Sequence, residues 1–291
     1  MSERFDRLTA FSPRDKDSES YDDGREFELL EFVKSHPDLE SVRGSPHKVL
    51  NLIDQYERTK KCLLKLNNDK ARMICTLIAD VKPKTMVSPR STTGLVDISA
   101  RGKATRRSGL TVLQVEMGGY FAEIAGSLIE LAGLSDVVKV IVGSSAASTG
   151  CLCWIGLKQI DILFLGHDKP AYTPTLKLCE ELFLIAPGSW LVADNVFWPG
   201  NYPYLEYVML RVIEKKTNLA RTESAKSEYK PCTIMDLHNK IYGEMNPDLT
   251  PGNPNLVYVT KLVEGSGPTN DRRCSIFLST VPNASNPNPE I

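Results

Sequence analysis

Short apolar runs alternate with longer amphipathic segments through the middle of the chain, and this alternation constrains the fold more than any other feature. The runs predict strands at Leu113–Glu116, Val137–Val142, Ile160–Leu165 and Leu191–Ala193, and the other segments predict helices at Tyr120–Ala132, Thr175–Ile185 and Pro203–Lys216. Strands that read as continuous apolar runs are typical of a parallel sheet covered on both faces. The pattern therefore predicts a doubly wound, Rossmann-like α/β fold with a mostly parallel sheet.

The flanking regions give weaker signals. Three helices are predicted before the first strand, within residues 24–37, 45–66 and 67–83. Residues 1–24 are charged and rich in Ser and Asp, which predicts disorder. One more helix is predicted near Ile234–Met245. We expect one domain over residues 25–263, with a divergent loop at 88–112 and a divergent, disordered tail over 264–291.

The composition bounds the class of partner. The chain has 291 residues and a formal net charge of −1, which gives no electrostatic basis for a nucleic-acid or membrane-surface partner. The first residues lack the apolar core of a signal peptide, and no run approaches the roughly 18 apolar residues of a membrane span. The 7 cysteines are scattered, which favours reduced thiols. We therefore expect a cytoplasmic protein without a nucleic-acid or membrane partner, and separately we expect a monomer that acts on a small molecule.

Polar side chains follow two of the predicted strands directly. Asp194 and Asn195 end the run WLVA, and His167, Asp168 and Lys169 follow DILFLG. Ligands of open α/β sheets bind outside the carboxyl ends of the strands. Carboxylate and amide oxygens suit Mg²⁺, and a lysine beside a divalent cation can act as a base. The alternative that Asp194 and Asn195 simply start a turn stays open, because both residue types favour turns.

A third strand end carries an acidic residue, Glu116 in VLQVEM. In a nucleotide-binding α/β sheet an acidic residue at such a position grips ribose hydroxyls, although a solvated charge is the plain alternative. Taken together, the three strand ends favour a site for a nucleoside and a metal. An NAD-dependent oxidoreductase fits less well, because no G-x-G-x-x-G follows any predicted strand.

Several segments resemble the catechol O-methyltransferase family, in the family's order and across most of residues 25–210. They are IDQYERTKKCLLKLNNDKARMICTLI, VKPKTMV, VEMGGYFAEIAGSLIELAGLSDVVKVIVGSS, IDILFLGHDKPAYTPTLKLCEELFLIAPGSWLVADNV and PGNYPYLEYV. The most specific pieces are ADN after an apolar strand and H-x-K after FL. The resemblance implies a class I methyltransferase fold, S-adenosylmethionine and Mg²⁺ as cofactors, and methyl transfer to a catechol-type hydroxyl.

The resemblance also implies a role for individual residues. Lys169 would be the catalytic base that takes the hydroxyl proton. The metal ligands would be Asp194 and Asn195. The cofactor-binding residues would be Glu116, Met117, Ser145, His167 and Leu66. The catechol slot would be lined by Trp198, Pro199 and Glu264.

The sequence departs from the family's pattern at these sites. The family has a glycine-rich cofactor loop after its first strand, whereas residues 88–112 read SPRSTTGLVDISARGKATRRSGLTV. A metal-binding Asp of the family is replaced by Gly166, and Asp168 is the candidate to replace that ligand. Leu66 lies where the family has an N-V-G stretch, and Glu264 follows the last similar residues, TKLV.

The two abrupt losses of similarity suggest a defective gene model, with 88–112 and 265–291 as out-of-frame translation. The alternative function is therefore a catalytically inactive homologue that keeps the fold.

Overall fold

A computed structural model describes residues 24–61, 63, 66, 68–89, 110–116, 119–142, 156–167, 169–196, 200–224, 252–264 and 275–282. These residues form a seven-stranded sheet in the order β3-β2-β1-β4-β5-β7-β6. Its strands are β1 (Thr85–Pro89), β2 (Thr111–Glu116), β3 (Val138–Val142), β4 (Ile162–Leu165), β5 (Trp190–Asp194), β6 (Val259–Glu264) and β7 (Ser275–Thr280). Strands β1 to β5 pair in parallel, and β7 runs antiparallel to both β5 and β6. The predicted doubly wound, mostly parallel sheet is confirmed.

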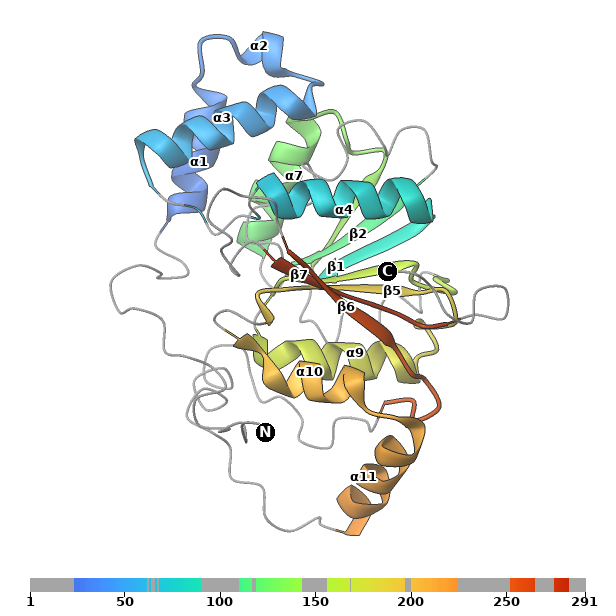
Figure 1. The fold of residues 1–291 in the computed structure, drawn as a ribbon. Coiled ribbons are helices and arrows are strands. Elements are labelled where there is room, and N and C mark those ends of the chain that lie inside the picture. Colours follow the sequence, from blue (N-terminus) through green and yellow to red (C-terminus); the bar gives the residue numbers. More distant parts are fainter. Residues whose placement is uncertain are drawn as a thin grey trace.

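Helices cover both faces of the sheet (Figure 1). They are α1 (Arg25–Lys34), α2 (Leu39–Val42), α3 (Pro46–Thr59), α4 (Asn68–Val81), α7 (Gly119–Leu131), α9 (Tyr172–Glu181), α10 (Tyr202–Met209) and α11 (Val212–Ser224), with a short 3-10 helix η1 (Lys169–Ala171) before α9. Helix α4 lies over one face, and α9 and α10 lie over the opposite face. Helices α1 and α3 contact α7, which in turn contacts β3.

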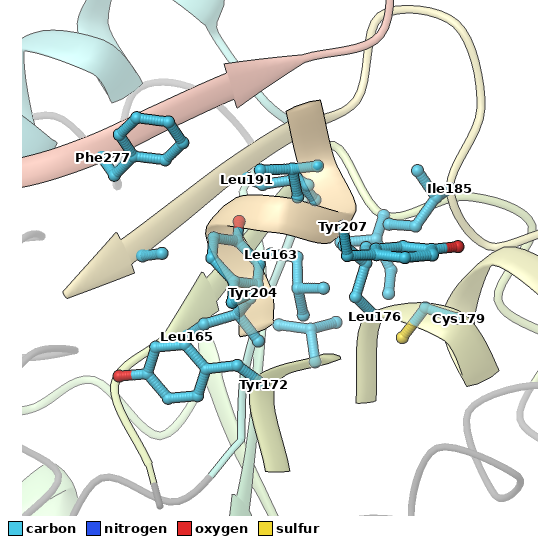
Figure 2. Close-up of a cluster of buried hydrophobic side chains, with 14 of the residues drawn as sticks. Leu163, Leu165, Tyr172, Leu176, Cys179, Ile185, Leu191, Tyr204, Tyr207 and Phe277 are labelled. Carbon is cyan, nitrogen blue, oxygen red and sulfur yellow. The ribbon is translucent and has the colours of Figure 1, made fainter. Parts of the chain in front are cut away.

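Alternate residues of each central strand face different helices. In β4, Ile162 and Phe164 pack with α4, whereas Leu163 and Leu165 pack with α9 and α10. Figure 2 shows the second of these clusters, in which aromatic side chains including Tyr172 and Tyr204 surround the leucines. Burial on both sides explains why the strands read as continuous apolar runs rather than as alternating ones.

The region predicted as one helix over Pro203–Lys216 contains two, so that prediction is wrong. Helix α10 ends at Met209, and Leu210 is extended, with φ −67° and ψ 138°. Glu214 then accepts a hydrogen bond from the backbone N–H of Arg211 at 2.8 Å and pairs with its guanidinium at 2.7 Å. A Glu at the third helical position that reaches back to the N-cap N–H is a helix start signal. The chain can therefore turn between two helices that share a continuous apolar pattern.

The structure also corrects the expected domain limits. Strand β1 extends to Pro89 and β2 begins at Thr111, so the ends of the loop expected at 88–112 belong to strands. The expectation of a disordered tail from residue 264 is wrong for 275–280, because β7 sits inside the sheet with Ile276 and Phe277 buried on opposite faces. Such two-sided burial argues against out-of-frame translation of this strand. Residues 1–23, 90–109, 234–245, 265–274 and 283–291 lie outside the described part of the chain.

Candidate active site

Asp194 and Asn195 lie where β5 ends, at the carboxyl edge of the parallel strands. Asn195 has a left-handed backbone, with φ 55°, a conformation that Asn tolerates better than most residues. The Asn195 side-chain amide donates to Asp194 Oδ2 at 3.1 Å, so the turn folds the two polar groups toward each other. Strained backbone of this kind is concentrated at functional sites. The residues thus form a turn, as one reading of the sequence allowed, and also a polar cluster.

The cation in this cluster is Lys70, which the sequence reading did not single out. Its Nζ lies 2.6 Å from Asp194 Oδ1 and donates to Asn195 Oδ1 at 2.8 Å. The side chains of Lys70 and Asp194 are only 6% and 12% exposed. We call Lys70, Asp194 and Asn195 the Lys70 cluster. Lys70 lies one and two helical turns before Ile74 and Ile78, which face the core. A lysine on the apolar face of a helix needs a buried partner, and that signal was available in the sequence.

The expected Mg²⁺ site does not fit the residues as they are placed. The oxygens of Asp194 and Asn195 that were predicted to bind the ion are bound to the ammonium of Lys70 instead. Gly166 supplies no ligand, and a Cβ there would lie 2.5 Å from the ring of the buried Phe164. Asp168, the candidate to replace that ligand, lies outside the described residues. Among the described residues, no group of three or more His, Cys, Asp and Glu side chains gathers as a metal site would require.

The end of β4 is tied to the end of β5 through an aromatic pair. The His167 ring stacks on Tyr172, with ring centroids 5.0 Å apart, and its Nε2 lies 3.2 Å from the Thr175 hydroxyl. Tyr172 is buried and donates its hydroxyl hydrogen to the backbone oxygen of Asp194 at 3.2 Å. Lys169 follows in η1, where its backbone oxygen accepts a hydrogen bond from the Asn201 side chain at 2.8 Å. His167, Lys169 and Asp194 therefore share one edge of the sheet.

Glu116 ends β2 at the same edge. Its side chain is buried, and Oε1 accepts a hydrogen bond from the Gln114 amide at 2.6 Å. Gln114 and Glu116 are two residues apart in a strand and so point to the same face. A buried carboxylate at a strand end suits a ligand that offers hydroxyl donors.

The positions of two other predicted site residues say little about a role in the site. Leu66 packs at the margin of the core between α4 and the sheet, so its described contacts are those of a core residue. Glu264 is exposed at the end of β6, one row beyond the row that contains Asp194. The other predicted residues lie outside the described part of the chain: Met117, Ser145, Asp168, Trp198 and Pro199.

Comparisons with known proteins find similarity to O-methyltransferases. No protein-family model matches the chain. The chain is 29% identical over 187 residues to catechol O-methyltransferase B of Danio rerio, a match that covers 62% of this chain and 66% of that protein. It is 28% identical over 209 residues to a probable O-methyltransferase of Mycobacterium tuberculosis, covering 68% of this chain and 86% of that protein. The match to the Danio rerio protein spans just under two thirds of its length.

A solved structure supports the fold. A methyltransferase from Geobacter sulfurreducens superposes with a TM-score of 0.51 at 15% identity, over 81% of this chain and 89% of that one. The predicted resemblance to catechol O-methyltransferases and the Rossmann-like α/β fold are both confirmed. Separately, none of the helices in the described residues combines the length and the apolar character needed to cross a bilayer.

Proposed function

We propose that this chain transfers a methyl group from S-adenosylmethionine to a catechol-type hydroxyl of a small molecule. The observation that carries the proposal is the gathering of Glu116, His167, Lys169 and Asp194 at one carboxyl edge of a doubly wound sheet. This edge is where such folds bind nucleotide-like ligands. Support also comes from those relatives that are named catechol O-methyltransferases.

The residues divide into cofactor and acceptor roles. Glu116 would accept hydrogen bonds from the ribose hydroxyls, and His167, Met117 and Ser145 would flank the cofactor. S-adenosylmethionine supplies an electrophilic methyl group on its sulfonium. Lys169 would take the proton of the acceptor hydroxyl as the methyl moves to oxygen and leaves a neutral thioether. Holding both reactants in line can supply roughly 7–11 kcal/mol of the barrier.

Magnesium does not enter this proposal, although the resemblance implied it, because two of its expected ligands, Asp194 and Asn195, contact Lys70. Trp198, Pro199 and Glu264 are proposed to line the acceptor slot. The chain is proposed to act as a cytoplasmic monomer. A formal net charge of −1 supports the further proposal that no nucleic acid takes part.

A radiolabelled methyl-transfer assay with a simple catechol tests the function. The full chain should methylate the catechol, and Lys169→Met should lower kcat by roughly 100-fold or more through loss of the general base. Lys158→Met is the matched control, because Lys158 is exposed beyond the site and its loss should leave kcat unchanged. Failure of a folded wild-type chain to transfer methyl to any phenolic acceptor would favour the inactive homologue.

A further inference from the structure

In the Lys70 cluster, an ammonium group of the chain itself takes the place of a bound cation between two side-chain oxygens. An ammonium with two short contacts, 2.6 Å to Asp194 and 2.8 Å to Asn195, is held on two oxygens at the end of β5. The cluster is enclosed, since the Lys70 side chain is only 6% exposed. A charge so shielded from water is kept only when it is paired, so Lys70 and Asp194 depend on each other.

The surrounding structure favours the ammonium over a divalent ion. Mg²⁺ needs near-octahedral oxygen ligands and is normally held by more than one carboxylate or by substrate phosphates. Among the described residues, Asp194 is the carboxylate that contacts Lys70, and the end of β4 has Gly166, where the Phe164 ring fills the space of a Cβ. An ammonium, by contrast, needs only hydrogen-bond acceptors at the observed distances.

We propose that Lys70 permanently replaces a divalent metal in this site, so that the chain holds Asp194 and Asn195 in place without binding Mg²⁺ there. Lys70 is then a positioning residue that keeps the end of β5 folded. The end of β5 in turn positions His167, because the Tyr172 hydroxyl donates to the Asp194 backbone oxygen and the His167 ring stacks on Tyr172. The inference rests on the proposed function only in treating this edge as the reaction site.

Metal binding can be measured on the unaltered full chain. Titration with Mn²⁺, followed by electron paramagnetic resonance, reports bound ion directly and requires no catalysis. We expect no saturable Mn²⁺ site into the low millimolar range, and no change in melting temperature with Mg²⁺. Saturable binding of one Mn²⁺ that Asp194→Asn abolishes would overturn the proposal. Neither result depends on methyl transfer, so failure of the proposed function would be seen separately.

Two variants test the role of the ammonium. Lys70→Met should lower the melting temperature by roughly 10 °C, because it leaves the Asp194 carboxylate buried without its cation. Lys84→Met is the matched control, because Lys84 is exposed just beyond the other end of α4 and its change should cost nothing measurable.

The outcomes remain decisive if Lys70→Met fails to fold. Lys70→Arg keeps the charge, so it should fold and retain the wild-type insensitivity to metal; saturable Mn²⁺ binding by folded Lys70→Arg would overturn the proposal. Equal stability of Lys70→Met and wild type would show that the ion pair is dispensable and would overturn the proposal.

Discussion

Glu180 is a fully buried carboxylate that joins four segments of the chain, and its charge should be essential to stability. It lies in α9 and accepts hydrogen bonds from the hydroxyls of Tyr207 and Tyr258, both at 2.5 Å, and from the backbone N–H of Asn253 at 2.8 Å. Lys215 Nζ lies 3.7 Å away, with its side chain 3% exposed. These five residues, the Glu180 cluster, join α9, α10, α11 and the segment before β6. Burial lowers the pKa of Lys215, and the attraction of Glu180 opposes that effect.

Glu180→Gln keeps the shape of the side chain but removes its charge. Lys215 would then be a buried cation without its counter-ion, a loss that typically costs 3–5 kcal/mol, or about 4 kcal/mol here. The NH₂ of the new amide would also replace a carboxylate oxygen that accepts hydrogen bonds, so two donors would oppose each other; this adds a cost of roughly 1 kcal/mol or more. The expected total, about 5 kcal/mol, is a large share of the roughly 5–15 kcal/mol that keeps a domain folded.

Urea unfolding of the full chain, followed by circular dichroism, measures this free energy of unfolding. Glu206→Gln, an exposed site on α10, is the matched control and should change stability by less than about 0.5 kcal/mol. The double variant Glu180→Gln/Lys215→Met should lose less than the sum of its single variants, because neither charge is then left alone. A loss under about 1 kcal/mol for Glu180→Gln, or additive losses in the double variant, would refute this reasoning.

Three further predictions concern other parts of the fold. Gly252 has a left-handed backbone, with φ +75°, and a Cβ there would lie 2.5 Å from Glu180. Gly24 has a similar φ of +81° but open space around it, so Gly24→Ala is the control and should cost roughly 1–2 kcal/mol of unfolding free energy. Gly252→Ala should cost well over that amount in urea unfolding. Burial, the charge of Glu180 and its hydrogen bond raise the pKa of the Tyr207 phenol. Its stabilising effect is therefore complete below the unfolded pKa of about 10 and is lost at higher pH, so Tyr207→Phe should show a shallower alkaline fall in melting temperature than wild type. Asp161→Ala should cost about 2 kcal/mol in urea unfolding, because Oδ2 accepts the backbone N–H of Thr85 at 2.9 Å; a loss below about 0.5 kcal/mol would contradict this.

The sequence predicts the parallel core well because burial on both faces leaves a strong signal. Runs such as Ile162–Leu165 contain apolar residues throughout, and their boundaries differ from the predicted ones by only a few residues. Strand β7 is harder to predict because SIFLST mixes Ser and Thr with apolar residues, and its place between β5 and β6 follows from long-range pairing. The break before α11 depends on a side-chain cap at Glu214 that apolar periodicity does not reveal.

The candidate site was predictable in its location but not in its electrostatics. Strand ends identify Glu116, His167 and Asp194, because the topology of a parallel sheet brings carboxyl ends together. Lys70 lies more than a hundred residues away from Asp194 in the chain, and their pairing depends on how α4 crosses the sheet. An acidic strand end was therefore read as a metal ligand, although its partner is an ammonium.

Calorimetric titration of the full chain with S-adenosylmethionine, in the presence of a metal chelator, tests the central claim most directly. The account predicts binding at one site, and a weakening of roughly 10- to 100-fold in a folded Glu116→Gln variant, which loses an acceptor for the ribose hydroxyls. Glu123→Gln, exposed on α7, should bind like wild type. At ~100 times its dissociation constant the ligand should also stabilise the fold by about 2.7 kcal/mol. No binding by a folded wild-type chain, or equal binding by Glu116→Gln, would contradict the claim that this strand edge holds the cofactor.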